Sequence, residues 1–381
     1  MDCLTKEKWI IIILLIAWHS VSATNNILAK IVLNKFNHPL TVTLVQFFLT
    51  TIFTWPLLYF KLVKTSENSI GISGRYWVTW LIPLAVAKII TTTSSQWSIA
   101  KLSVSYVHTV KASMPIFTVV FLRLLFKKKQ TILTYFSLLP IIIGVGISSG
   151  TEQSFNIIGF ISALIATCGF TLQHIFNKRL LDASQIHTFQ LVLITGQLSL
   201  LLFAPIWVVT DLRALWNEYS DAGKFASVPS IYWMEVTGLL LADGILCFLQ
   251  NLLAFVILSK VAPLTYSVAN ATKRIEIIIV SIIILQNVVT LFNVLGMTLA
   301  VSGVLLYTYA KQRKSSEAKL DIPESEELNY TTRIIIKDAA PLQNNNYSTN
   351  DQHIEKNQGN GDLLQPGIVL LKYCSEQDGN S

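Results

Sequence analysis

The segment from Pro263 to Leu285 is long enough to cross a lipid bilayer, yet it contains the adjacent cations Lys273 and Arg274 near its middle. A second apolar segment, Val104–Phe126, contains Lys111 in the same way. A charge at the centre of a membrane helix costs about 2.5–3.5 kcal/mol on insertion scales. Charges that are retained at such a cost indicate a functional site inside a membrane protein.

The composition agrees with a membrane protein. Of the 381 residues, 52% are hydrophobic and 13% are charged, whereas soluble domains carry about 25% charged residues. The net charge of +7 does not indicate a nucleic-acid partner, because Lys and Arg cluster in short loops between apolar segments, where they report topology. The sequence has no metal-ligand spacing, nucleophile elbow or phosphate-binding glycine loop, so we expect neither an enzyme nor a bound cofactor.

Apolar segments of about 20 residues recur along the chain and predict an all-α membrane protein with ten transmembrane helices. The expected spans are 9–33, 41–62, 76–98, 103–126, 132–150, 155–176, 188–210, 232–258, 263–286 and 289–309. The third span is interrupted by Lys88 and a cluster of Thr and Ser, and the eighth contains Glu235 and Asp243. Residues 9–310 therefore form the predicted transport domain.

The charge distribution predicts that both termini face the cytosol. Lys and Arg gather in the N-terminal segment 1–8, in the loops after every second span and at the start of the tail. The opposite side carries only Lys35, Lys101, Arg213 and Lys224. Positive residues concentrate on the cytosolic side of membrane proteins.

The tail, 311–381, is rich in Ser, Glu and Asn and has little that could form a core. We therefore predict that it is disordered and cytosolic. Its glycosylation sequons at Asn329 and Asn346 would stay unmodified on that side of the membrane.

Ten spans divide into halves of five, at about 9–150 and 155–310, and many transporters consist of two inverted halves. The turns before spans four and nine, 100–106 and 259–266, both contain a small residue, then Lys, then Ser or Thr before Tyr. The last span of each half carries glycines, among them Gly144 and Gly150 in the first half and Gly296 and Gly303 in the second. These features predict a five-plus-five inverted repeat.

Lys111 and Lys273 are expected at similar depth, although their spans enter from opposite faces. Lys111 follows Ser103 by eight residues, or about 12 Å of helix, and Lys273 follows Pro263 by ten residues, or about 15 Å. Both then lie near the midplane, where inverted repeats place their substrates. With Arg274, whose planar fork suits two phosphate oxygens, they predict a site for a phosphate ester.

An internal ion-pair network is the alternative to a substrate site. Glu276 follows Lys273 at helix-neighbour spacing, and Asp243 could pair with Arg274. Two carboxylates would still leave three cations with excess positive charge, which favours a functional site. His108, one turn before Lys111, is interpreted as a packing or hydrogen-bonding residue.

A polar cluster at 91–96 in the third span, and Gln250 with Asn251 in the eighth, are candidates for contacts with substrate hydroxyls. Hydrogen bonds between helices are an equally good explanation of the cluster at 91–96.

The segments Val107–Pro115 and Ala262–Arg274 resemble the two hallmark segments of the triose-phosphate translocator family. This family belongs to the drug/metabolite transporter superfamily, and the resemblance is greatest to solute carrier family 35 subfamily E. The similarity covers about residues 10–310 and not the tail. It implies the drug/metabolite transporter fold, a ten-helix antiporter with inverted symmetry.

The resemblance also implies roles for single residues. Lys111, Lys273 and Arg274 match the cations that hold the substrate phosphate in plastid members. Thr92 and Ser95 stand where the family has a His and a Thr in the third helix, and Gln250 stands where it has a Tyr in the eighth. The phosphate clamp is kept while its surroundings differ, which argues against triose phosphate itself.

We therefore expect an antiporter for a sugar phosphate or a nucleotide sugar, surrounded by membrane lipids. No Arg- and Ser-rich transit peptide precedes the first span, which favours the Golgi or another endomembrane over a plastid. A homodimer is compatible with the sequence. A carrier for unphosphorylated carboxylates, or a non-transporting scaffold that acts through its tail, are the alternatives.

Overall fold

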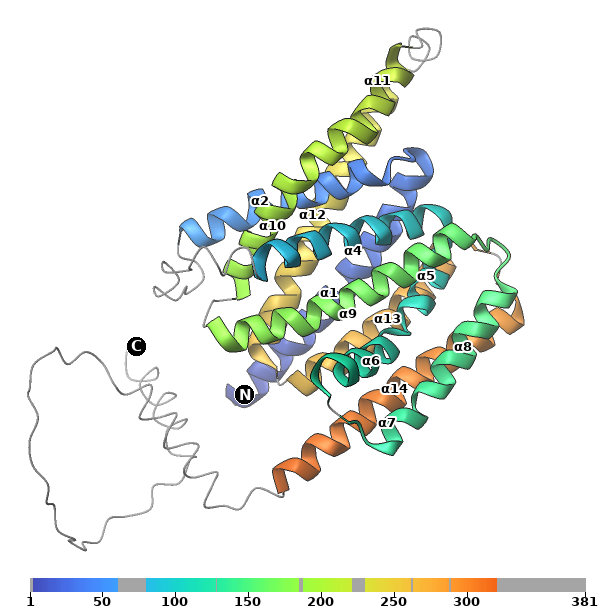
Figure 1. Ribbon diagram of the computed structural model, residues 1–381. Coiled ribbons are helices and arrows are strands. Elements are labelled where there is room, and N and C mark those ends of the chain that lie inside the picture. The colour runs from blue at the N-terminus through green and yellow to red at the C-terminus, as the bar shows by residue number, and fades with distance from the viewer. Residues whose placement is uncertain are drawn as a thin grey trace, which may run out of the picture. The chain divides into compact units, whose positions relative to one another are not determined.

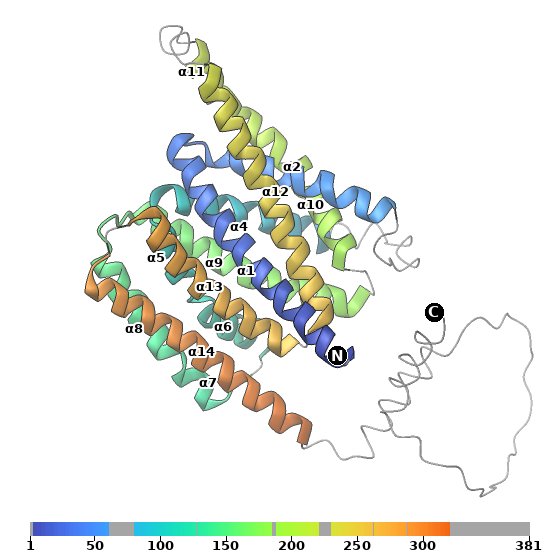
Figure 2. The ribbon, with the colours of Figure 1, turned by 180° about the vertical axis from the view of Figure 1, so that it is seen from behind.

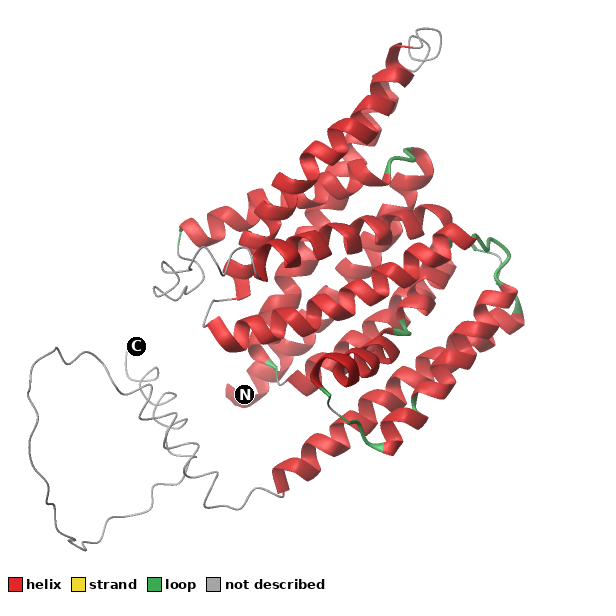
Figure 3. Cartoon of the chain, in the orientation of Figure 1, coloured by secondary structure: helices red, strands yellow, loops and turns green. Residues whose placement is uncertain are grey.

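The structure is a computed structural model, and it describes residues 3–60, 80–127, 129–184, 188–220, 230–261, 263–287 and 289–320 (Figure 1). Within these ranges all regular structure is helical and there is no strand (Figure 3). The chain divides into a unit of Ile11–Ser315 and a unit of Met1–Ile10 with Ser316–Ser381. The last helix continues to Leu320, through the first ten residues of the predicted tail, so the expected disorder is not seen at 311–320. The tail beyond residue 320, with both sequons, lies outside the described residues.

The helices of the first half of the chain are α1 (Cys3–Lys35), α2 (Pro39–Tyr59), α4 (Ile82–Lys101), α5 (Val104–Lys111), α6 (Met114–Phe126), α7 (Ile132–Phe136) and α8 (Leu138–Thr151). Those of the second half are α9 (Ile157–Ser184), α10 (Thr188–Trp207), the π-helix η3 (Val208–Leu212), α11 (Arg213–Ser220), α12 (Ser230–Lys260), α13 (Pro263–Leu285) and α14 (Leu291–Leu320). Figures 1 and 2 show the long helices side by side, with successive ones running in opposite directions. The helices follow the predicted spans closely.

Eight helical segments of the described residues are long and apolar enough to cross a membrane, so the chain is a multi-pass membrane protein. In two of them a pair of short helices, α5 with α6 or α7 with α8, forms one span. Helices α4 and α13 are not among the eight. Lys88 and the polar cluster at 91–96 lower the hydropathy of α4, and α13 carries Lys273, Arg274 and Glu276.

The bundle has an apolar exterior and a partly polar interior, as expected in a bilayer. Exposed side chains include Ile13, Ile143 and Ile283. Fully buried polar side chains include Thr43 and Asp243. The outer faces of these helices are therefore suited to contact with lipid tails.

Pro115 explains why the fourth predicted span is broken into α5 and α6. It occupies one of the first two positions of α6. A proline has no backbone N–H, and its ring would clash with the carbonyl four residues earlier, which here belongs to Lys111. Helix α5 therefore ends at Lys111, and its last carbonyl is left for another donor.

Helices α8 and α14 pack closely through glycines. A Cβ on Gly144 would lie 2.4 Å from the backbone nitrogen of Ala300, and a Cβ on Gly296 would lie 2.7 Å from that of Ser148. Small residues allow such approach of two membrane helices. Three of the four glycines noted in the sequence lie at this contact, since Gly303 abuts Ile141 in α8, whereas Gly150 has open space around it.

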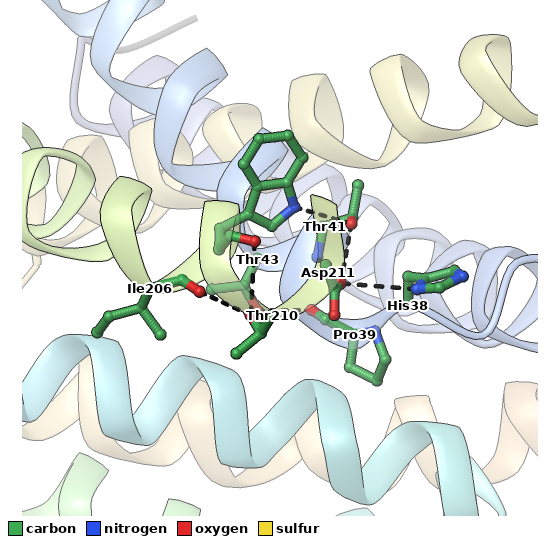
Figure 4. Close-up of polar contacts among 8 residues, drawn as sticks. His38, Pro39, Thr41, Thr43, Ile206, Thr210 and Asp211 are labelled. Carbon is green, nitrogen blue, oxygen red and sulfur yellow. Dashed lines mark hydrogen bonds and ion pairs between the residues drawn. The ribbon is translucent and has the colours of Figure 1, made fainter. Parts of the chain in front are cut away.

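The start of α2 is capped by a carboxylate from the other half of the chain (Figure 4). Asp211 Oδ2 accepts hydrogen bonds from the backbone N–H and the hydroxyl of Thr41, both at 2.9 Å. The Nδ1 of His38 lies 3.9 Å from the same oxygen. Thr41 is in the first turn of α2, where N–H groups lack intrahelical partners and negative charge is favourable. The π-helix that contains Asp211 thereby joins α10 to α2.

Candidate substrate-binding site

Lys111, Lys273 and Arg274 come together because α5 packs against α13. The guanidinium of Arg274 donates from Nη1 to the backbone carbonyl of Lys111. Its Nη2 lies 3.2 Å from the sulfur of Met114. The accepting carbonyl is the one that Pro115 leaves without a helical partner. The break between α5 and α6 thus fixes the position of the arginine, and all three cations are half-buried.

Each lysine of the site lies over an aromatic ring from the other half of the chain. The Nζ of Lys111, in the first half, is 5.8 Å from the ring centroid of Phe170 in α9. The Nζ of Lys273, in the second half, is 4.3 Å from that of Trp18 in α1. Such cation–π contacts contribute about 0.5–2 kcal/mol each and leave the charge in place. The site therefore keeps its attraction for an anion.

The predicted ion-pair alternative is wrong for both carboxylates. Glu276 Oε2 lies 3.0 Å from Nδ1 of His19. Asp243 is fully buried and accepts a hydrogen bond of 2.8 Å from Gln46 Nε2. Among the residues that the structure describes, Lys111, Lys273 and Arg274 form no ion pair with a carboxylate. The excess of positive charge at the site is therefore larger than the sequence suggested.

The polar cluster of α4 divides between the two roles expected for it. Ser95 belongs to the cation site, because its Oγ accepts a hydrogen bond of 2.8 Å from Lys111 Nζ. Thr91 packs on Gly169 of α9, and Gln96 donates to Gln46 Oε1 at 2.9 Å. Thr92 is half-buried and precedes Ser95 by three residues, which places both on one face of the helix.

Gln250 of α12 is half-buried, and its Oε1 has no hydrogen-bond partner within the described part of the chain. Within this part of the chain, no hydrogen bond joins Gln250 to Lys111, Lys273 or Arg274. His108 has the hydrogen-bonding role predicted for it: its Nε2 lies 2.9 Å from Asn26 Oδ1, and the side chain is buried.

Trp18, His19 and Phe170 contact the site and were not predicted. Each lies within an apolar span, where aromatic residues are common and carry no distinct signal. A histidine in the middle of the first span was the one recognisable sign, because ionisable residues inside membrane helices are usually functional.

Hydrogen bonds join the two halves of the chain at the end of the bundle where α8 ends and α14 begins. Glu152 accepts from Ser103 Oγ and from Asn293 Nδ2, both at 2.8 Å. Ser148 Oγ donates to Asn293 Oδ1 at 3.2 Å. Ser103 caps the N-terminus of α5, so this network connects the helix that carries Lys111 with α14.

Comparison with known proteins agrees with this architecture. Residues 10–308 match the model of the Triose-phosphate Transporter family. A putative transporter of Schizosaccharomyces pombe is 32% identical over 81% of this chain and 68% of its own length. A chloroplastic glucose-6-phosphate/phosphate translocator of Arabidopsis thaliana is 30% identical, over 77% of this chain and 73% of its own. A chloroplastic triose phosphate/phosphate translocator of Brassica oleracea is also 30% identical, over 83% of this chain and 75% of its own length. The chain therefore belongs to the Triose-phosphate Transporter family.

Proposed function

We propose that this protein is an antiporter that exchanges a phosphorylated organic anion, a sugar phosphate or a nucleotide sugar, across an endomembrane. The observation that carries the proposal is the cluster of Lys111, Lys273 and Arg274, which has no carboxylate partner within the described residues. A phosphate ester supplies the missing negative charge and fits the fork of an arginine. The relatives named above as phosphate translocators support the same substrate class.

The three cations bind the phosphate group, and α4 and α12 contact the rest of the substrate. Ser95 orients Lys111, and Thr92 on the same face offers a hydroxyl. Gln250 has a carbonyl oxygen without a partner among the described residues, and this oxygen can accept a hydrogen bond from a sugar hydroxyl. These neutral groups suit a polyol or sugar better than a second carboxylate.

The ten-helix inverted repeat is supported by the helix contacts. If α5–α6 and α7–α8 each count as one span, and α10 with η3 and α11 as another, each span in one half has a counterpart five spans later. Contacts then occur between counterparts, as for α2 with α10 and α5 with α13. A contact between two helices also recurs when each helix is replaced by its counterpart in the other half. The contact of α2 with α12 corresponds in this way to that of α10 with α4. The contact of α5 with α9 matches that of α13 with α1, which includes His19 and Ala269.

The network around Glu152 provides one gate of such a carrier. It ties the halves together at one end of the bundle, and alternating access requires the two ends to open in turn. With both termini in the cytosol, as the loop charges indicate, this end faces the lumen.

The first helix is part of the proposed transport domain. Residues 11–35 of α1 contribute Trp18, Ala23 and Leu33 to the core of the bundle, so this segment belongs to the transport domain. Protease added to sealed Golgi vesicles should remove the predicted cytosolic tail, 311–381, and leave the bundle intact. A protected tail would contradict the orientation.

Reconstitution of the purified protein into proteoliposomes tests the proposed function. Vesicles preloaded with inorganic phosphate are offered labelled sugar phosphates, nucleotide sugars or unphosphorylated carboxylates. We expect uptake of at least one phosphorylated compound and none by Arg274→Ala. Uptake of carboxylates alone would identify a different substrate class, and no uptake of any anion would contradict transport and favour a scaffold.

A further inference from the structure

His19 of α1 lies between two oxygen atoms of α13. Its Nδ1 is 3.0 Å from Glu276 Oε2, and its Nε2 is 3.1 Å from the carbonyl oxygen of Ala269. A carbonyl only accepts hydrogen bonds, so Nε2 must carry a proton. The contact with Glu276 requires one further proton, on the imidazole or on the carboxyl group. In either arrangement the pair of His19 and Glu276 is neutral as a whole.

This pairing changes what Lys273 can do. Glu276 follows Lys273 by three residues of the same helix, a spacing at which opposite charges attract each other. Instead, the ammonium of Lys273 lies over Trp18, the residue before His19, and the Trp18 ring stacks on Tyr266 at 5.4 Å between centroids. Two consecutive side chains of α1 thus keep the cation and the carboxylate of α13 apart.

We propose that His19 is a positioning residue of the substrate site, which binds Glu276 and so leaves Lys273 free for the substrate phosphate. The inference rests on the proposed function and extends it to a residue outside the phosphate clamp. Without His19, Glu276 carries a full negative charge beside Lys273. It would then compete with the substrate for that cation.

The test measures binding of inorganic phosphate to the purified full-length protein and phosphate exchange in proteoliposomes. His19→Ala should weaken phosphate binding about tenfold, since a released carboxylate at contact distance offsets much of one cation's attraction. The loss should appear as a higher KM, with the maximal exchange rate within about twofold, because the clamp itself is intact. The double variant His19→Ala/Glu276→Gln should restore the affinity to within about threefold of wild type.

Rescue by Glu276→Gln separates this role from a purely structural one, because a packing defect at His19 would persist in the double variant. His38→Ala is the matched control: His38 also lies beside a carboxylate, that of Asp211, but outside the site, and phosphate binding should be unchanged. Wild-type affinity in His19→Ala, or a double variant as weak as His19→Ala, would overturn the inference.

If His19→Ala does not fold, Glu276→Gln alone decides the question. If Glu276 is already neutralised by His19, its replacement by Gln should change phosphate affinity less than about threefold. If Glu276 is instead paired with Lys273, the same replacement would tighten phosphate binding about tenfold. The tightening would overturn the inference and leave the proposed function standing. A wild-type protein that binds and exchanges no phosphate would instead contradict both.

Discussion

Arg274 donates a hydrogen bond to the backbone carbonyl of Lys111, from the second half of the chain to the first. The carbonyl is available because Pro115 cannot continue the helix past Lys111. A guanidinium has five N–H donors, so anchoring it at a carbonyl and beside the Met114 sulfur leaves others for a substrate. The hydrogen bond to the neutral carbonyl therefore holds Arg274 beside Lys111 and leaves both positive charges available to bind an anion.

We predict that the shape of Arg274, and not its charge alone, is required. Arg274→Lys keeps the cation but loses the fork that holds two phosphate oxygens and reaches the Lys111 carbonyl. Exchange should fall by about 10- to 150-fold, the equivalent of about 1.5–3 kcal/mol for a charge-assisted hydrogen bond. Exchange rates of purified Arg274→Lys and Arg274→Ala in proteoliposomes provide the check. Arg213→Ala, an exposed arginine on α11, should retain full exchange, and equal rates for Arg274→Lys and wild type would contradict the role of the fork.

Lys273→Ala should fold and lose transport. A buried charge left without its partner can cost several kcal/mol, but here Glu276 is paired with His19 and is not stranded by the loss of Lys273. The cost is then the cation–π contact with Trp18, about 0.5–2 kcal/mol. Size-exclusion profiles and thermal unfolding in detergent should show a monodisperse protein that does not exchange phosphate. If Lys273→Ala aggregates and the double variant Lys273→Ala/Glu276→Gln does not, Lys273 and Glu276 form an ion pair, contrary to this prediction.

The glycines between α8 and α14 should tolerate no side chain. In Gly144→Ala the new Cβ would lie 2.4 Å from a backbone nitrogen, and backbone atoms cannot move aside as a flexible side chain can. Overpacking costs about 1–3 kcal/mol, so the melting temperature in detergent should drop. Gly146→Ala on the same helix is the control, since no atom lies within 4 Å of its Cβ position. Equal melting temperatures for the two variants would show that the helices are not packed this closely.

The sequence predicted the helical architecture well because long apolar segments in a membrane have few alternatives. It also singled out Lys111, Lys273 and Arg274, which the structure brings together, because charges in apolar segments are conspicuous. The ion pairs that the sequence offered as the alternative to a functional site do not form among the described residues, for a physical reason. Spacing along one helix suggested Lys273 with Glu276, but the partner of a side chain also depends on which helix packs against it, and α1 brings His19 to that face.

The contacts of α4 show the same limit. The cluster at 91–96 was visible in the sequence. Its division among Gly169 of α9, Gln46 of α2 and Lys111 of α5 depends on the rotation of α4 in the bundle. Single-sequence periodicity does not give that rotation when several faces of a helix are buried.

In the proposed exchange, the empty site carries excess positive charge, which the substrate must neutralise before the carrier reorients. Like charges about 6 Å apart repel by roughly 3 kcal/mol at an effective dielectric near 20, and a phosphate ester contributes about −1.5 to −2 charges. A barrier lower by 3 kcal/mol corresponds to a rate about 150-fold higher.

The most direct measurement uses a labelled sugar phosphate or nucleotide sugar that the reconstituted protein transports. It compares the rate of uptake into proteoliposomes preloaded with inorganic phosphate with the rate of uptake into empty proteoliposomes. We predict uptake about 150-fold faster into the preloaded vesicles, in line with the barrier estimate, and no dependence on an imposed pH gradient. Uptake into empty vesicles within a few-fold of the preloaded rate would contradict charge neutralisation by the substrate as the reason for strict exchange.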